Sequence, residues 1–146
     1  MKQKVIKYQS EDYQKSVELR DKILRKPLGM IFTEEFLADD ENEYILGLFD
    51  KQKILATLNL RPLSSTTLKM RQVAVDNHIQ GKGLGGILVD FSEEYAIENG
   101  FDEIVLHARD TAVKFYLCLD YEILDPEYFT EVGIQHLKMG KRLTKE

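Results

Sequence analysis

The sequence predicts an α+β fold whose central sheet is mixed, mostly antiparallel and flanked by helices. Apolar runs with strand-like composition follow one another over residues 44–49, 54–60 and 68–75. A run with helical periodicity occupies residues 84–99, and a further strand-like run, 103–108, follows it at once. Strands joined by short turns pair antiparallel, whereas a strand–helix–strand crossover pairs its strands in parallel, so the sheet should contain both kinds of pair.

The N-terminal quarter is expected to hold a strand and an amphipathic helix. Residues 3–8 read as the strand, and Asp12 is the expected N-cap of a helix that runs to about Leu24. Ser16 and Arg20 interrupt the apolar arc of this helix, and we expect both to reach out to water from its edge rather than to face a substrate. The apolar residues of the arc are Tyr13, Val17, Leu19, Ile23 and Leu24.

The remaining elements follow from turn and cap signals. Thr33 is the expected N-cap of a short helix. Asp50-Lys51-Gln52-Lys53 separates the first two of the three apolar runs, as in a β-hairpin. Gly100 is placed to stop the helix 84–99. A shorter helix over residues 111–119 and strands near 121–123 and 133–139 complete the chain.

Composition and charge exclude several classes of protein. With 146 residues and no Pro-, Gly- or Ser-rich linker, the chain is expected to be a single domain over residues 1–146. The single cysteine, Cys118, rules out an internal disulfide and a cysteine-rich zinc site, so no metal is expected. A net charge of −5 argues against a nucleic-acid partner. Because no stretch is apolar enough for a membrane span or a signal peptide, we expect a cytoplasmic protein with no membrane partner.

A glycine-rich segment, residues 80–86, joins a strand to the clearest helix and is called the glycine loop below. Its glycines are Gly81, Gly83, Gly85 and Gly86. Glycine lets the backbone approach a ligand without a Cβ clash, and the unpaired N–H groups and dipole of a helix N-terminus favour an anion. A diphosphate is therefore the expected occupant, with Lys82 adding a charge-assisted contact. The plainer alternative is a flexible turn before a helix.

The loop also matches Gly-x-Gly-x-x-Gly, the dinucleotide fingerprint, which leaves an NADP-binding domain as an alternative. Three features oppose it. Residues 76–80 separate the glycines from the strand, whereas the fingerprint needs them close to it. Arg109 stands where an acidic residue is wanted, although it would suit a 2′-phosphate, and only about 60 residues remain for the rest of such a fold.

Two segments together resemble the GNAT N-acetyltransferase superfamily. Residues 70–85 are similar to the family's central strand and its Gln/Arg-x-x-Gly-x-Gly loop, and residues 112–121 are similar to its Ala-x-x-Phe-Tyr segment. Residues 19–25 and 133–139 look like the branch related to the bacterial ElaA and YjcF proteins. Arg109 departs from the family's usual Asn, and Asp120 departs from its usual Gly, which suggests a different turn before Tyr121.

The resemblance implies acetyl-CoA as acyl donor and a GNAT-type fold. The pantetheine arm would pair with the strand 68–75, and the thioester would lie where this strand and the strand 103–108 splay apart. The residues that the resemblance assigns to the cofactor are Val73, Ala74, Val75, Gln80, Gly81, Lys82, Gly83, Leu84, Gly85, Ala112 and Phe115. Phe115 also reads as a core residue of its helix. The partner would be an amine acceptor, a small molecule or a peptide, and homodimers are common among similar proteins.

Acetyl transfer needs a neutral amine and a proton for the departing thiolate. The resemblance places Tyr116 where the family usually has the acid, and the alternative is a packing role for this aromatic ring. No carboxylate lies on the strand 68–75, so we expect a base from elsewhere or a water chain. His136 and Glu35 are the expected catalytic residues, and His107 is a further candidate, with a structural role as the alternative for both histidines. His78 is expected to be an exposed loop residue.

The charge of the acceptor is left open by the sequence. The acidic stretch 34–43 would attract a cationic amine, or would be a solvated loop, whereas Arg25 and Arg71 would favour an acceptor with a carboxylate or phosphate. A non-catalytic acyl-CoA sensor that uses the same pocket is the alternative to an enzyme.

Overall fold

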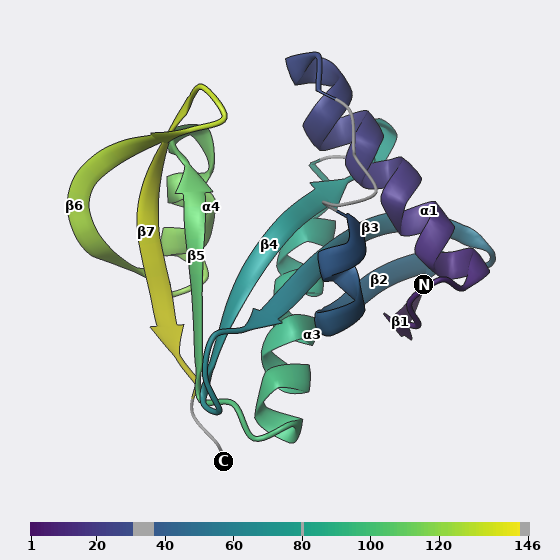
Figure 1. The fold of residues 1–146 in the computed structure, drawn as a ribbon, viewed down its shortest axis with the longest axis horizontal. Helices are drawn as coiled ribbons and strands as arrows, with labels where there is room; N and C mark the ends of the chain where they lie inside the picture. Colours follow the sequence, from purple (N-terminus) through teal and green to yellow (C-terminus); the bar gives the residue numbers. More distant parts are fainter. Residues whose placement is uncertain (31–36, 80, 144–146) are drawn as a thin grey trace. The chain divides into compact units, whose positions relative to one another are not determined.

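Seven strands form a mixed sheet in the order β1-β2-β3-β4-β5-β7-β6 in the computed structural model, which describes residues 1–30, 37–79 and 81–143 (Figure 1). The β4–β5 pair is parallel, and the β1–β2, β2–β3, β5–β7 and β6–β7 pairs are antiparallel, which confirms the predicted fold class. The strands are β1 (Lys2–Ile6), β2 (Tyr44–Asp50), β3 (Lys53–Pro62), β4 (Thr67–Val75), β5 (Glu103–Arg109), β6 (Glu122–Glu131) and β7 (Ile134–Arg142). The α-helices named below are α1 (Glu11–Arg20), α3 (Leu84–Glu98) and α4 (Val113–Cys118).

The chain divides into two compact units. The first comprises Met1–Arg61 and Arg71–Ser92, and the second comprises Pro62–Met70 and Glu93–Glu146. Strand β4 and helix α3 each contribute residues to both units.

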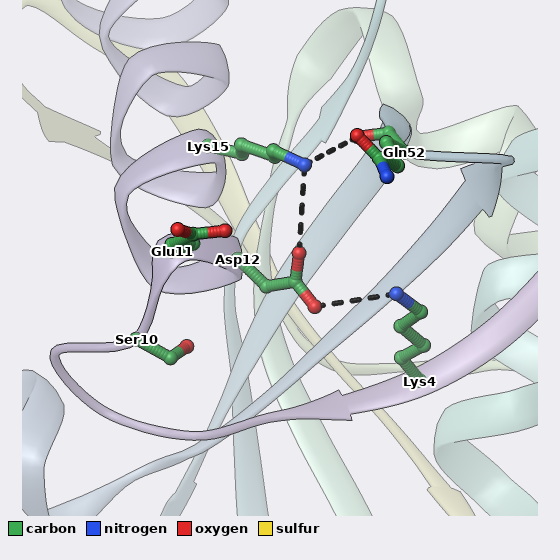
Figure 2. Close-up of a pocket in the computed structure, with 6 residues that line it drawn as sticks. All are labelled: Lys4, Ser10, Glu11, Asp12, Lys15 and Gln52. Atoms are coloured by element: carbon green, nitrogen blue, oxygen red, sulfur yellow. Dashed lines mark hydrogen bonds and ion pairs between the residues drawn. The ribbon is translucent and has the colours of Figure 1, made fainter.

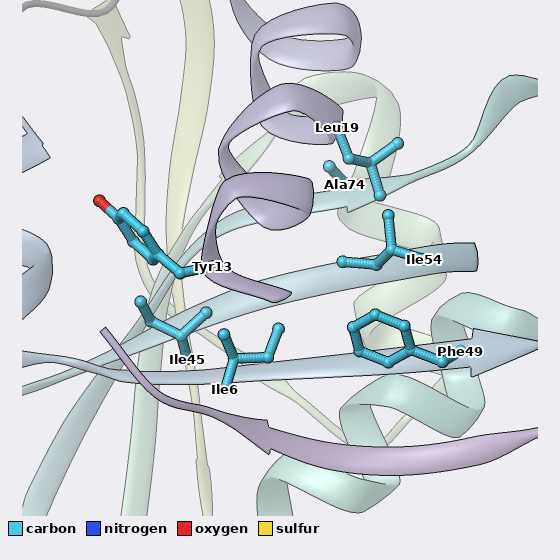
Figure 3. Close-up of a cluster of buried hydrophobic side chains, with 7 residues drawn as sticks. All are labelled: Ile6, Tyr13, Leu19, Ile45, Phe49, Ile54 and Ala74. Atoms are coloured by element: carbon cyan, nitrogen blue, oxygen red, sulfur yellow. The ribbon is translucent and has the colours of Figure 1, made fainter. Parts of the chain in front are cut away.

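Helix α1 covers one face of the first unit's strands. Its N-cap is Ser10, whose hydroxyl accepts a hydrogen bond from the Tyr13 N–H at 3.1 Å, so the prediction of Asp12 as the cap is wrong by two residues. The helix ends at Arg20 and continues as a π-turn over Asp21–Arg25. Figure 3 shows Tyr13 and Leu19 of α1 directed toward the strands. The core cluster there is Ile6, Tyr13, Leu19, Ile45, Phe49, Ile54 and Ala74, with Val17, Ile23 and Leu24 packed at its edge, as predicted.

Both faces of β3 are covered. Its residues 56–60 are all buried, although successive side chains of a strand point to opposite faces. Thr57 and Asn59 point toward α1, because the Thr57 hydroxyl lies 2.8 Å from that of Ser16. The first part of α3 covers the opposite face (Figure 1). A sheet shielded on two sides explains why β2 and β3 read as nearly continuous apolar runs.

Strands β5, β7 and β6 with helix α4 make up most of the second unit. Residues 67–70 of β4 pair in parallel with residues 103–106 of β5. Strand β6 runs to Glu131 and β7 to Arg142, so the strands predicted over 121–123 and 133–139 were too short. Pro126 and the polar residues around it hid the length of β6, where the β6–β7 register shifts between Asp125 and Phe129.

The helix α3 begins and ends almost as predicted, at Leu84 and Glu98, and Gly100 follows it with a left-handed φ of 87°. Asp120 follows α4 with a left-handed φ of 70°, a conformation that glycine adopts without steric cost. The expectation of a different turn there stays a prediction. Among the described residues, no helix is both long and apolar enough to cross a membrane.

Candidate functional site

The glycine loop presents an open backbone at the start of α3. Gly81 and Gly83 adopt left-handed φ angles of 87° and 76°, which non-glycine residues rarely take. A Cβ added at either position would find no described atom within 4 Å, and both residues and Lys82 are exposed. No described atom therefore occupies the space into which a side chain at either glycine would project.

The first turn of α3 offers hydrogen-bond donors beside this open backbone. Its first intrahelical bond runs from the Ile87 N–H to the Gly83 carbonyl oxygen at 3.2 Å. The amides of Leu84, Gly85 and Gly86 come before it and have no acceptor within the helix. The positive end of the helix dipole lies at these amides and favours an anion there. Gln80 lies outside the described residues.

Asp76 fixes the start of the glycine loop. Its N–H donates to the Leu55 carbonyl oxygen at 2.9 Å, and its Oδ1 accepts from the His78 N–H at 3.0 Å. The Ile79 N–H closes the turn on the Asp76 carbonyl oxygen at 3.1 Å. The hydrogen bond from His78, helped by the Lys22 ammonium at 3.5 Å, lowers the pKa of the Asp76 carboxyl. Sequence reasoning missed this residue, although an Asx-turn signal is present in Asp76-Asn77. His78 is exposed, as predicted.

The strand that leads into the loop is irregular at Gln72, which has a φ of 54°. A left-handed residue within a strand is typical of a β-bulge and re-aims the residues that follow it. Of the residues assigned to the pantetheine arm, Ala74 is buried in the core cluster under α1, whereas Val73 and Val75 are only partly buried. A contact of Ala74 with a cofactor would therefore involve its backbone.

A buried ionic network lies beneath α1 and includes Arg20, a side chain expected from the sequence to be exposed to solvent. Arg20 Nη2 contacts Asp40 Oδ2 at 2.8 Å, and Arg20 Nη1 donates to Gln72 Oε1 at 3.1 Å. Both Ser16 and Arg20 are fully buried, so the prediction that they reach out to solvent is wrong. A buried charge is tolerated when it is paired and hydrogen-bonded. Asp40 pairs with Arg20, and it also accepts a hydrogen bond from the hydroxyl of Tyr13, which lies 27 residues before it in the chain.

The same network holds two residues of the acidic stretch 34–43, Asp40 and Glu43. Glu43, whose side chain is 1% exposed, contacts the guanidinium groups of Arg61 and Arg71. Asn59 Nδ2 donates to Asp40 Oδ1 at 3.0 Å and to Glu43 Oε1 at 3.2 Å. Asp40 and Glu43 are therefore not surface charges that attract an amine, and the reading of this stretch as a solvated loop fails for these two residues. Glu35 lies outside the described residues.

Tyr116 lies in α4 and is 7% exposed. Its ring makes edge contacts with those of Phe115 and Tyr121. The Tyr121 hydroxyl donates to Glu93 Oε2 at 3.0 Å, whereas no described residue hydrogen-bonds the Tyr116 hydroxyl. Burial raises the pKa of Tyr116 to about 12. Phe115 is 38% exposed, so the alternative of a plain core role for it is wrong.

The remaining histidine candidates lie together in the second unit. His107 Nδ1 is 3.0 Å from Glu131 Oε2, and His136 Nε2 is 4.0 Å from Glu131 Oε1. Phe129 contacts both imidazoles, edge-on to His107 and stacked on His136. Sequence reasoning named both histidines but missed Glu131, because only the β5–β7–β6 pairing brings it to them.

A pocket of about 450 Å³ at the N-terminus of α1 is lined by none of the predicted catalytic or cofactor-binding residues (Figure 2). Three of its charged residues are paired with one another, since Lys4 contacts Asp12 at 3.3 Å and Lys15 contacts Asp12 at 3.7 Å. Lys15 also donates to the Gln52 carbonyl oxygen.

Comparison with known proteins agrees with the resemblance. Residues 3–121 match the model described as the Acetyltransferase (GNAT) family. The chain is similar to the uncharacterized N-acetyltransferase YjcF of Bacillus subtilis, at 27% identity over 138 residues that cover 94% of this chain and 97% of YjcF. Escherichia coli ElaA has the same fold, with a TM-score of 0.82 at 14% identity, over 97% of this chain and 99% of ElaA.

A solved aminoglycoside 6′-N-acetyltransferase, complexed with coenzyme A, also shares the fold. Its TM-score is 0.83 at 13% identity, and the match covers 100% of this chain and 99% of that one. At such identities the two solved structures show the fold alone. The match of the family model and the similarity to YjcF go further, and they confirm the predicted resemblance and its branch.

Proposed function

The chain belongs to the GNAT acetyltransferase family, and from this premise we propose that it transfers an acetyl group from acetyl-CoA to a primary amine of a small molecule or peptide by direct attack. The observation that carries the proposal is the exposed glycine loop, with two left-handed glycines beside first-turn amides of α3 that have no acceptor within the helix. A turn that served only to start a helix would not need two residues in this conformation.

In the proposed complex the amides of the glycine loop hold the diphosphate of CoA, and Lys82 adds a cationic contact. The pantetheine arm pairs with the backbone of Val73 and Val75, which follow the left-handed Gln72 and are only partly buried. Ala112 and Phe115 are further proposed contacts of the cofactor. The exposure of Phe115 supports such a contact, because an exposed aromatic ring is free to pack against a ligand.

Tyr116 is the proposed acid that protonates the departing thiolate. Its hydroxyl has no hydrogen-bond partner among the described residues although its ring is buried, so the proton is available for a ligand. A free thiol has a pKa of about 8.5, so proton donation from a phenol of pKa about 12 is uphill in the ligand-free protein. Apolar surroundings also raise the pKa of a thiol, which narrows the difference in pKa between the thiol and Tyr116.

GNAT acetyltransferases act on amines, and the attacking amine must be neutral. Holding an alkylamine of pKa about 10.4 neutral at pH 7 costs roughly 4–5 kcal/mol, whereas an α-amino group near 8 costs about 1 kcal/mol. A base or a water chain is therefore needed, and the candidates for the base are Glu35, His136 and His107.

Ligand-dependent stability tests this function. Acetyl-CoA at about 100 times its dissociation constant should stabilise the protein by roughly 2.7 kcal/mol, which raises the melting temperature by about 5–10 °C. NADPH at the same concentration should give no shift, because the loop lacks the spacing of a dinucleotide fingerprint. A shift with NADPH alone would overturn the proposal.

A thiol-release assay with acetyl-CoA and a panel of amines then separates an enzyme from a sensor. The panel should include polyamines, an aminoglycoside and short peptides with a free α-amino group. Amine-dependent release of CoA supports the transferase. Stabilisation by acetyl-CoA without thiol release from any amine would favour the non-catalytic acyl-CoA sensor.

A further inference from the structure

Glu131 of β6 lies close to two histidines, His107 of β5 and His136 of β7. Its Oε2 is 3.0 Å from His107 Nδ1 of β5, and its Oε1 is 4.0 Å from His136 Nε2 of β7. Strands β5 and β7 pair with Arg109 opposite His136 and His107 opposite Lys138, so both imidazoles project from the same face of these strands. The cluster thus combines groups from three strands.

The hydrogen bonds fix which nitrogen of each neutral imidazole carries the proton. An ionised carboxylate only accepts, so His107 Nδ1 must donate to Glu131, and its Nε2 then holds the lone pair. His136 Nδ1 donates to the Ile134 carbonyl oxygen at 2.8 Å, which also leaves the lone pair on Nε2. That nitrogen faces Glu131, however, and His136 is 4% exposed. His107 is 26% exposed at its side chain, so its lone pair is the more accessible one.

The surroundings keep His107 neutral at physiological pH. Burial lowers the pKa of His107, and the nearby cations Lys69 of β4 and Lys138 of β7 lower it further. Glu131 opposes both effects by stabilising the imidazolium. A base that is neutral at pH 7 and becomes stabilised once it has accepted a proton suits the deprotonation of an amine.

The β6–β7 turn and an aromatic ring hold this arrangement. Val132 and Gly133 have φ angles of 48° and 76°, as in a two-residue type I′ turn, which sets Glu131 directly opposite Ile134. A β-branched residue in the left-handed region is strained, and such strain persists where the surroundings enforce it. Phe129 packs edge-on against His107 with ring centroids 4.9 Å apart and so limits rotation of the imidazole.

We propose that His107 is the general base of the acetyl transfer and that Glu131 is the residue that positions its imidazole. The proposal rests on the proposed function. His107 Nε2 takes a proton from the ammonium form of the acceptor, which leaves a neutral amine. The amine nitrogen then forms a bond to the thioester carbonyl carbon and loses its second proton to solvent. The C–S bond then breaks with its electron pair going to sulfur, and the Tyr116 hydroxyl protonates the thiolate. Exchange with solvent returns both side chains to their starting states.

Three variants and one matched control test it: His107→Gln, Glu131→Gln, His136→Gln and Glu122→Gln. Glu122 is an exposed residue of the same strand as Glu131, and its partner in the register is Gly140. Each variant is first melted with and without acetyl-CoA, because the base assignment requires an unchanged stabilisation by the cofactor. The pH dependence of thiol release is then measured with the amine of the panel that gives the fastest rate.

His107→Gln should lower kcat by about 10²–10⁴-fold at pH 7 and remove the decline in rate at acidic pH. Its rate should recover as the pH approaches the pKa of the amine, since the amine then no longer needs a base. Glu131→Gln should lower kcat by about 10–100-fold and move the acidic decline to lower pH, because the imidazolium loses its carboxylate. Glu122→Gln should behave as wild type.

A wild-type pH profile in His107→Gln would overturn the base assignment while leaving the acetyltransferase in place. Loss of the acidic decline in His136→Gln alone would overturn it in favour of His136. If the wild-type protein shows neither stabilisation by acetyl-CoA nor thiol release, the proposed function fails first and this role fails with it.

Discussion

Arg20 and Asp40 form an ion pair of 2.8 Å in which neither side chain reaches solvent, with exposed fractions of 0% and 1%. The carboxylate also accepts from the Tyr13 hydroxyl at 2.8 Å and from Asn59 Nδ2 at 3.0 Å. Burial and the bond to Asp40 raise the pKa of Tyr13, which therefore acts as a donor throughout the accessible pH range. The pair connects α1, the segment before β2 and the strand β3 within the first unit.

Arg20→Met should destabilise the protein by about 3–5 kcal/mol, because it leaves the Asp40 carboxylate buried without its cation. Urea denaturation of the purified variant measures this loss. Arg142→Met is the matched control: its ion pair with Asp102 spans 3.9 Å between exposed side chains, and its removal should have no measurable effect. Equal effects of the two substitutions would contradict the importance of the buried pair.

Gly81→Ala and Gly100→Ala separate backbone strain from ligand binding. Both glycines have a φ of 87°, and neither has a described atom within 4 Å of an added Cβ. Each substitution should therefore cost about 1–2 kcal/mol of stability through the left-handed backbone. Only Gly81→Ala should weaken acetyl-CoA binding, by about tenfold or more, because its methyl group enters the open side of the glycine loop. Calorimetric titration with acetyl-CoA checks this, and equal affinities of the two variants would remove the loop from the site.

The sequence predicted the fold well where the periodicity was strong. Gly100 was identified as the stop of α3 from its position alone, and the β2–β3 hairpin follows from two apolar runs around a polar turn. The prediction that Arg20 is exposed failed, because a charged residue in an apolar arc can either extend its head group to solvent or pair with a buried partner. Only the tertiary structure brings Asp40 to it.

The candidate site was predictable only in its local parts. The glycine loop is contiguous in sequence, so its residues could be named from the chain. Glu131 and His107 are 24 residues apart, and their contact depends on the register of β6 against β7, including a shift near Pro126. No local pattern determines such a register, which is why the histidines were named without the carboxylate that orients one of them.

Asp76→Asn should make the stability less dependent on acidic pH. The folded protein holds the pKa of Asp76 below its ordinary value of 3.8, chiefly through the hydrogen bond from the His78 N–H. A carboxyl with a lowered pKa adds stability above its unfolded pKa, and this contribution is lost as the pH falls below about 4.

Urea denaturation at pH 7 and pH 3 measures this contribution. Asp76→Asn should be about 1 kcal/mol less stable than wild type at pH 7, because the N–H then donates to a neutral oxygen. The difference should shrink at pH 3. Asp90→Asn, an exposed change on α3, provides the comparison and should give no such trend. A constant difference between Asp76→Asn and wild type at both pH values would contradict the assignment.

Tyr116→Phe tests the proposed acid with the smallest change of structure. The substitution removes a hydroxyl that no described residue hydrogen-bonds and leaves the ring contacts with Phe115 and Tyr121 in place, so the folded protein should keep its stability within about 0.5 kcal/mol. Acetyl-CoA should still stabilise the variant as it does wild type. Turnover should fall by about 10²-fold or more, since the thiolate must then leave unprotonated or take its proton from water.

Tyr121→Phe is the matched control for this experiment. It also removes a phenolic hydroxyl, but one that donates to Glu93 at 3.0 Å, so it should lower stability by about 1 kcal/mol or more and leave the chemical step intact. Thiol release at saturating acetyl-CoA, together with melting temperatures of both variants, distinguishes the two roles. Wild-type turnover in Tyr116→Phe would exclude the hydroxyl as the acid and assign Tyr116 to packing.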